Sequence, residues 1–255
     1  MHTALRGHAT VEWFDSFADV RRAIERGQRT VTVVVGMSDN VGATALSFAD
    51  AVRSDRCGTS IVVCCDLDAG NQHPISELAV AGVHDILFTG VNDDGYTARM
   101  VIFGACLGGA ADVVMHAVAP TIPAGLLRFV DVAVRRPREL RRVAEVATAL
   151  NVPRQTLGRW CRANGYVRPE ELLMWARLFL VAALLETTDR TLESIANELG
   201  YGSPTALRNR LREYTGLTST QIREGGLALV LSVFERRLDE DRQKREGRRR
   251  VTRVG

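Results

Sequence analysis

Two short segments in the C-terminal half of the chain carry polar side chains at the spacing of one helix face. They are Arg154, Gln155 and Arg159 in the first segment and Thr205, Arg208 and Asn209 in the second. Forked guanidinium donors suit the two acceptors of guanine, and side-chain amides suit adenine. These residue types therefore point to the reading of base edges in the major groove of double-stranded DNA.

The second segment follows a predicted helix and a tight turn. The apolar residues that place this helix and the next one against a core are Leu192, Ile195, Ala196, Leu199, Leu207, Leu211 and Tyr214. Thr191 is the expected N-cap of the first helix, and Gly200 is expected to end it in the left-handed conformation. Ser203 and Pro204 then begin the second helix as N-cap and first residue. The pattern predicts a helix-turn-helix.

The same unit occurs about fifty residues upstream. Its expected inward residues are Leu140, Val143, Ala147, Leu150, Leu157 and Cys161, with a turn at Asn151–Pro153. A long apolar helix, Pro169–Leu185, joins the two units. At ~1.5 Å per residue it is roughly 25 Å long, which suits two reading helices about 34 Å apart in successive major grooves. The sequence thus contains a duplicated module.

With these residues in place, the stretch from Pro123 to Arg223 resembles the DNA-binding domain of the AraC/XylS transcription regulators. The matching positions are Arg177, Ala182 and Leu185 on the joining helix, then Ile195-Ala196, Leu199-Gly200-Tyr201, Ser203, Leu207, Leu211 and Gly216. The resemblance implies two helix-turn-helix units that bind double-stranded DNA. Asn209 stands where the family usually has arginine, Gly158 where it often has a longer side chain, and a family glycine expected at Tyr166 lies at Gly165.

Three further arginines, Arg162, Arg210 and Arg212, lie toward the flanks of the two reading helices and are expected to contact phosphate. For an isolated basic helix, a solvated face would be the better interpretation. The duplicated scaffold instead favours base reading by the set as a whole.

Charge divides the chain where the duplicated module begins. Residues 1–134 carry 9 Arg and 15 Asp plus Glu, a net charge of −6, and residues 135–255 carry a net charge of +9. Five cysteines without paired metal-ligand spacing and an N-terminus without an apolar signal core favour a reduced, cytoplasmic protein. We expect no membrane association.

The first half alternates helices with apolar strands, which predicts an α/β, doubly wound, flavodoxin-like domain. Expected strands are Thr30–Val35, Ser60–Cys65 and Asp85–Phe88. Expected helices are Phe14–Arg26, Val41–Arg53, Ile75–Ala81 and Tyr96–Val118. Ser76–Gly90 resembles the fourth helix and fifth strand of a response-regulator receiver. Gly36 replaces the phosphate-accepting aspartate, and Thr89 or Gly90 replaces the lysine, so we expect a pseudo-receiver that is not phosphorylated.

Other chemistries find little support in the sequence. The loop Gly36–Thr44 opens a helix after a strand but lacks the lysine of a phosphate-binding loop. His73, His84 and His116 show no metal-ligand spacing. We therefore expect no catalytic residues, no metal and no cofactor, and thus no enzyme.

These observations predict a receiver-like α/β domain at 1–118, an all-α double helix-turn-helix domain at 119–225, and a helix with a mobile basic tail at 226–255. The expected function is sequence-specific transcription regulation, with a homodimer formed through the N-terminal domain. A small-molecule or protein effector and RNA polymerase are further expected partners. Two alternatives stay open: a protein-interaction adaptor that has lost base reading, and a flavodoxin-like enzyme fused to a DNA-binding domain.

Overall fold

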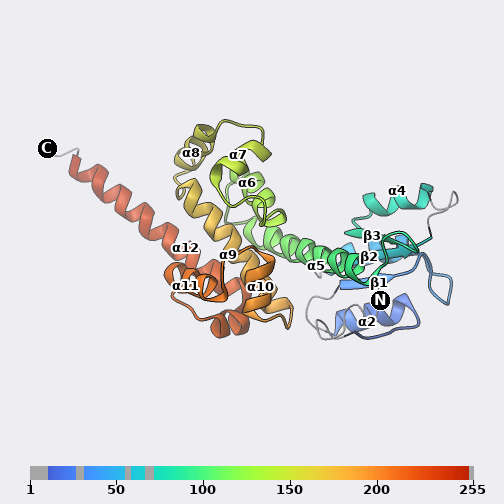
Figure 1. Ribbon diagram of the computed structural model, residues 1–255. Helices are drawn as coiled ribbons and strands as arrows, with labels where there is room; N and C mark the ends of the chain where they lie inside the picture. Colours follow the sequence, from blue (N-terminus) through green and yellow to red (C-terminus); the bar gives the residue numbers. More distant parts are fainter. Residues whose placement is uncertain (1–10, 27–31, 55–58, 67–71, 253–255) are drawn as a thin grey trace. The chain divides into compact units, whose positions relative to one another are not determined.

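The fold is described from a computed structural model, which covers residues 11–26, 32–54, 59–66 and 72–252. The chain divides into two compact units. The first consists of Met1–Val113 with Thr187–Asp189, and the second consists of Val114–Glu186 with Arg190–Gly255. Figure 1 shows a mixed helix and strand unit and an all-helical unit, and each is described by itself below.

The first unit contains a small parallel sheet. Its strands are β1 (Thr32–Val35), β2 (Ser60–Cys65) and β3 (Asp85–Phe88), and they lie in the order β1-β2-β3. The helices of this part of the chain are α2 (Phe17–Glu25), α3 (Ala45–Ser54), α4 (Gln72–Val80) and α5 (Gly95–Val118). Parallel neighbours need crossover connections, which α3 and α4 supply here.

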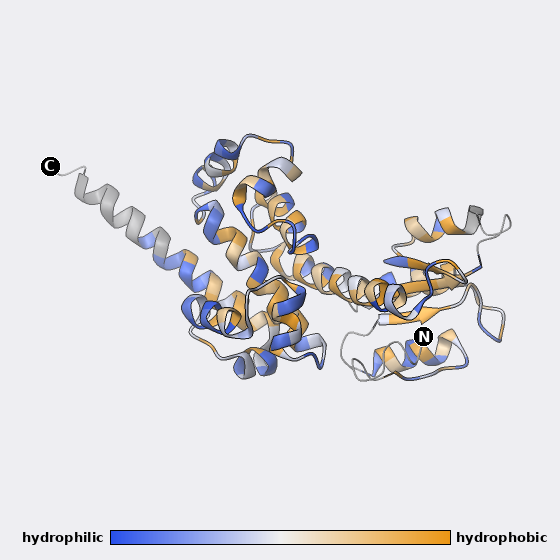
Figure 2. Cartoon of the chain, in the orientation of Figure 1, coloured by the Kyte–Doolittle hydropathy of each residue, from blue (hydrophilic) through white to orange (hydrophobic). Residues whose placement is uncertain are grey.

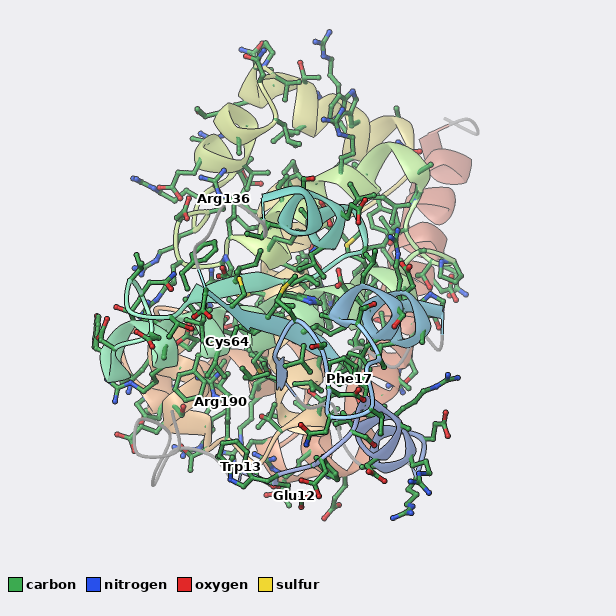
Figure 3. The ribbon with its side chains drawn as sticks, turned by 90° about the vertical axis from the view of Figure 1, so that its right-hand side faces the viewer. Glu12, Trp13, Phe17, Cys64, Arg136 and Arg190 are labelled. Atoms are coloured by element: carbon green, nitrogen blue, oxygen red, sulfur yellow. The ribbon has the colours of Figure 1, made fainter. Side chains whose placement is uncertain are left out.

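Alternation along the strands separates two apolar cores. On one face, Val33, Val35, Ile61 and Val63 pack with residues of α2, α3 and α4. Phe17 lies between α2 and the sheet (Figure 3) and packs against Phe48 at 5.0 Å between ring centroids. On the other face, Val62 and Leu87 pack with Ala98 and Ala105 of α5. Both faces are covered, as a parallel sheet requires.

The prediction of an α/β domain is confirmed, and β2 and β3 have the predicted bounds. Doubly wound sheets bind ligands in the crevice where the strand order reverses. The described strands lie in sequential order, so the strand order does not reverse among them. The finer description as a doubly wound receiver therefore stays a proposal. Two helices begin later than predicted, α2 at Phe17 and α3 at Ala45, because Ser16 and the loop at 36–44 make turns before them.

The second unit is all helical. Its helices are α6 (Ala124–Arg135), α7 (Val143–Ala149), α8 (Arg154–Ala163), α9 (Pro169–Thr187), α10 (Leu192–Glu198), α11 (Pro204–Thr215) and α12 (Ser219–Thr252). Thirteen of the 19 residues of α9 are buried, so this helix is the core of the unit. Figure 1 shows α9 running between the α7–α8 pair and the α10–α11 pair. Leu140, predicted within the first helix of the upstream unit, instead precedes α7 and is still buried.

Aromatic side chains join α9 to the last helix. Trp175 and Phe179 of α9 lie 5.0 and 5.3 Å from the ring centroid of Phe234 on α12, and Tyr166 lies 5.9 Å from the same ring. Aromatic pairs at such distances add to the stabilisation that comes from burying their area. Residues 226–238 are therefore part of the helical core. The tail predicted to be mobile is helical through Thr252.

A glycine bends α12 near its start. Gly226 has φ 64° and ψ −164°, a region that is essentially open only to glycine. The bend brings the amide of Leu227 to the carboxylate of Glu186, which accepts its hydrogen at 2.8 Å. The predicted break at Gly225-Gly226 is thus a kink that begins a new helical segment with a carboxylate at its N-terminus, a favourable place for negative charge.

Gly226→Ala tests this kink. A Cβ at position 226 would lie 2.4 Å from the Glu186 carboxyl carbon, in addition to the backbone strain. We expect a loss of roughly 1–3 kcal/mol in the free energy of unfolding, measured by urea denaturation. Gly125→Ala on α6 is the matched control, because a Cβ there meets no atom within 4 Å. Equal stability of the two variants would contradict the role assigned to the kink.

Candidate nucleic-acid interface

The second helix-turn-helix is fixed by local hydrogen bonds. Thr191 caps α10 by accepting from the amide of Ser194 at 3.1 Å, and Ser203 caps α11 by accepting from the amide of Ala206 at 3.1 Å. Between them Gly200 has φ 69°, the left-handed conformation that ends α10. Pro204 occupies the first turn of α11. The predicted caps and turn are confirmed.

The first helix-turn-helix uses different residues for the same geometry. Asn151 takes the left-handed conformation with φ 53°, which asparagine tolerates better than most side chains. The amide of Val152 then bonds to the carbonyl of Ala147 at 3.0 Å. At the start of α7, Glu145 accepts from the Arg142 guanidinium and from the amides of Arg142 and Arg141. These hydrogen bonds, the one from the Arg142 guanidinium first, lower the pKa of the Glu145 carboxyl.

Both reading helices bury the same pair of positions. Leu157 and Cys161 of α8 and Leu207 and Leu211 of α11 are at most 1% exposed. Burial, followed by the charge of Glu170, raises the pKa of the Cys161 thiol to about 11, so this cysteine stays protonated and behaves as an apolar side chain. The inward faces predicted for α8 and α11 are thus confirmed.

The proposed DNA-contacting side chains are all exposed in the second unit. They are Arg154, Gln155, Arg159 and Arg162 on α8 and Thr205, Arg208, Asn209, Arg210 and Arg212 on α11. Arg159 and Asn209 each come two residues after the first buried leucine of their helix, at equivalent positions fifty residues apart. A residue at that spacing points away from the core of its helix pair. Each of the two helices therefore exposes at least three of the predicted DNA-contacting residues.

Several of these arginines have weak local partners. Arg154 pairs with Glu170 at 3.1 Å, and Arg210 pairs with Glu213 at 2.6 Å, with about half or more of each side chain exposed. Arg159 donates to the Thr156 hydroxyl at 3.1 Å, and Arg162 donates to the Gly158 carbonyl at 3.3 Å. Exposed pairs of this kind contribute about 0–1 kcal/mol. A phosphate or base can therefore replace these partners at little cost.

One buried arginine fixes the second unit from inside. Arg177 of α9 is 5% exposed, and its guanidinium donates to the carbonyls of Pro137 and Leu199, the latter at 2.7 Å. The same group lies 4.9 Å from the ring centroid of Tyr201, a cation–π contact. Leu199 ends α10 and Pro137 follows α6, so one side chain holds the turn of the second helix-turn-helix against the helix that precedes the first. The sequence pattern marks Arg177 but not this role.

A second arginine holds the far end of α9. Arg223 donates to the carbonyls of Leu185 at 2.8 Å and Arg190 at 2.5 Å. It therefore connects the start of α12 to the last turn of α9 and to the residue before the cap of α10. Cations at the C-terminal end of a helix are favoured by its dipole. Arg223 thus holds the start of α10, whereas Arg177 holds its end, and nothing in the local sequence pattern predicts the Arg223 contact.

The loop at 36–44 was the other candidate site, and its polar groups are used internally. Asp39 accepts from the amides of Phe17, Val41 and Ala43 at 2.8–3.0 Å. The amide of Phe17, then those of Ala43 and Val41, lower the pKa of the Asp39 carboxyl. Amides that already donate to a carboxylate cannot hold a bound phosphate. The loop joins β1 to α3, and the hydrogen bond from the amide of Phe17 to Asp39 also ties it to the start of α2.

The turn after β3 is similarly occupied. Asn92 accepts from the amide of Phe88 at 2.6 Å, and Asp94 caps α5 by accepting from the amides of Tyr96 and Thr97. In the described ranges, no three histidine, cysteine or carboxylate side chains come together as ligands for a metal ion. His84 bonds to the amide of Ile61 and lies 3.3 Å from Asp112, a contact within the α/β unit.

Comparison with known proteins agrees with this geometry. A family model described as a helix-turn-helix domain matches residues 146–225, which include α8, α9, α10 and α11. The second unit is therefore a DNA-binding domain. It is of the AraC type, with two helix-turn-helix units, and this makes the chain a DNA-binding transcription regulator. No curated protein matches the chain.

Arg177→Ala tests the internal anchor. Removing the guanidinium leaves two buried carbonyls without a donor and removes the contact with Tyr201. We expect the free energy of unfolding of the second unit to fall by roughly 2–4 kcal/mol. Urea unfolding monitored by the fluorescence of Trp160 and Trp175 measures this change. Arg168→Ala, which removes an exposed arginine, is the control and should change stability by less than about 0.5 kcal/mol. A similar small change for Arg177→Ala would contradict the anchoring role.

Proposed function

We propose that this protein reads a bipartite DNA sequence by placing α8 and α11 in successive major grooves on one side of the duplex. Arg154, Gln155 and Arg159 then contact bases from α8, and Thr205, Arg208 and Asn209 contact bases from α11. Arg162, Arg210 and Arg212 hold the phosphate backbone and set the register. The observation that carries this proposal is the duplication: two recognition helices expose polar side chains at equivalent positions.

The two helices are not equivalent in chemistry. Position 159 carries an arginine, and the equivalent position 209 carries an asparagine. Arginine suits the acceptors of guanine, whereas asparagine suits the donor and acceptor of adenine. Similarly, Gly158 offers no side chain where Arg208 offers one. The two half-sites of the operator should therefore differ, with a guanine near Arg159 and an adenine near Asn209.

We further propose that the α/β unit regulates DNA binding without phosphorylation. In support, β1 ends at Val35 and Gly36 follows, where a receiver would carry its phosphate-accepting aspartate. Regulation then comes through a homodimer formed by this unit, or through a small-molecule or protein effector that binds to it. RNA polymerase is the proposed downstream partner. Because it binds DNA, the protein works in the compartment that holds the chromosome.

Selection of binding sites from a random duplex pool tests the central proposal. We expect a bipartite motif with its halves about one helical turn apart, and Arg159→Ala and Arg208→Ala should each relax one half. Each lost base contact should cost about 1–3 kcal/mol. Arg162→Ala is the matched control, because loss of a phosphate contact weakens all sequences alike and reduces the salt dependence. Weak, unselective binding would favour a protein-interaction adaptor instead.

Exchange of the two equivalent residues tests the base preferences. Arg159→Asn should shift one position of the α8 half-site from guanine toward adenine, and Asn209→Arg should make the opposite change in the α11 half-site. The measurement is the same selection, repeated with each variant. If the motif persists but neither position changes, these two side chains do not read bases.

A further inference from the structure

The last helix carries an apolar face that ends partway along its length. Four buried residues of α12 follow one another at three- and four-residue spacing, and they are Leu227, Val230, Phe234 and Leu238. This spacing places them on one face of the helix. Figure 2 shows hydrophilic colour on α12 where this apolar stripe ends. The helix itself continues to Thr252, which is roughly 20 Å further along its axis.

The same face of α12 then becomes basic. Positions 242, 245 and 249 continue the spacing of the apolar stripe, and each holds an arginine. Residues 242–252, which we call the basic arm, contain six basic residues and one acidic residue, a net charge of +5. Three acidic residues at 239–241 precede the arm, so the positive charge is concentrated in the last turns of the helix.

One ion pair places the base of the arm near α8. Arg237, five residues before the arm, lies 3.6 Å from the carboxylate of Glu171 in the first turn of α9. The neighbouring Glu170 pairs at 3.1 Å with Arg154, the first residue of α8. The same turn of α9 thus contacts both the end of the buried part of α12 and the start of one proposed reading helix.

An aromatic cluster connects the same part of α12 to α11. The ring of Phe234 lies 5.0 Å from that of Trp175 on α9, measured between centroids. Trp175 in turn lies 5.6 Å from Tyr214 of α11. The basic arm therefore leaves the helical core close to both proposed reading helices.

We propose that the basic arm binds the phosphate backbone of the duplex that α8 and α11 read. This inference rests on the proposed function and adds to it a contact that is independent of sequence. Basic side chains that neutralise phosphates release counterions, which strengthens binding without distinguishing one base from another. The arm thus raises the affinity for DNA, and the two reading helices select the site.

The composition of the arm favours DNA over a membrane or a protein partner. Val251 is the sole aliphatic or aromatic residue between Asp239 and Thr252. A helix that lies on a membrane needs an apolar face, and protein interfaces depend on buried anchors such as aromatic residues. Phosphate binding needs neither, because charge and charge-assisted hydrogen bonds supply the affinity.

The salt dependence of DNA binding by the full chain tests this inference. The arm variant carries four substitutions that remove charge and keep good helix formers: Arg242→Gln, Arg245→Gln, Arg248→Gln and Arg249→Gln. We expect it to bind the selected operator at least about tenfold more weakly at low salt. The slope of log K against log salt should fall in magnitude by about two to four. Fluorescence anisotropy of the labelled operator and of a duplex of unrelated sequence measures both quantities.

A matched control removes the same charge from the α/β unit. It carries substitutions at four exposed arginines: Arg21→Gln, Arg22→Gln, Arg26→Gln and Arg53→Gln. A loss of net charge alone weakens DNA binding by both variants alike, whereas loss of a local phosphate contact affects the arm variant alone. Circular dichroism checks that both variants are folded.

Ethylation interference then maps the contact on the operator. Phosphates whose ethylation weakens binding by the wild type but not by the arm variant support the inference, as does an unchanged selected motif in the arm variant. Equal affinity and slope for the wild type and the arm variant, an equal loss in the control, or tighter binding by the arm variant overturns it. Failure of the wild type to select a bipartite motif counts against the proposed function, whereas selective binding with an unaltered slope in the arm variant counts against the arm alone.

Discussion

The contact of Arg177 with the carbonyls of Pro137 and Leu199 connects the turn of the second helix-turn-helix to the segment that precedes the first. A single charged group inside a helical core is costly unless its donors are used, and here the fork is occupied by two helix-terminal carbonyls and the face of Tyr201. Because the C-terminal end of a helix carries partial negative charge, carbonyls at such ends stabilise the charged guanidinium. The turn of the second helix-turn-helix thereby gains a fixed position relative to α6.

The same scaffold supports two different reading surfaces. The buried pair on α8 is Leu157 and Cys161, and on α11 it is Leu207 and Leu211. These positions hold each helix in place, so the outward residues are free to differ. Arg159 and Asn209 occupy equivalent outward positions with different hydrogen-bonding chemistry. In the proposed function, duplication of the core with divergence of the exposed face gives one protein two recognition elements.

The α/β unit shows how polar groups near a sheet edge can be structural. Asp39 and Asp94 both occur where a parallel sheet often holds a ligand, but each accepts hydrogen bonds from nearby backbone amides. Buried or half-buried amides need such partners. On α5 of the same unit, Tyr96 and Met100 are apolar side chains that remain exposed.

The sequence alone determined the elements and the duplicated module. Periodicity and caps such as Thr191, Gly200 and Ser203 act between residues a few positions apart, so local rules located α10, α11, β2 and β3. The sequence also selected the outward residues of α8 and α11 by their type. It did not predict the start of α3 at Ala45, the helical continuation to Thr252, or the order of the strands. Only the tertiary structure showed that the guanidinium groups of Arg177 and Arg223 donate hydrogen bonds to carbonyls 22 to 40 residues away in the sequence. Contacts of that kind depend on how helices pack, which no local pattern records.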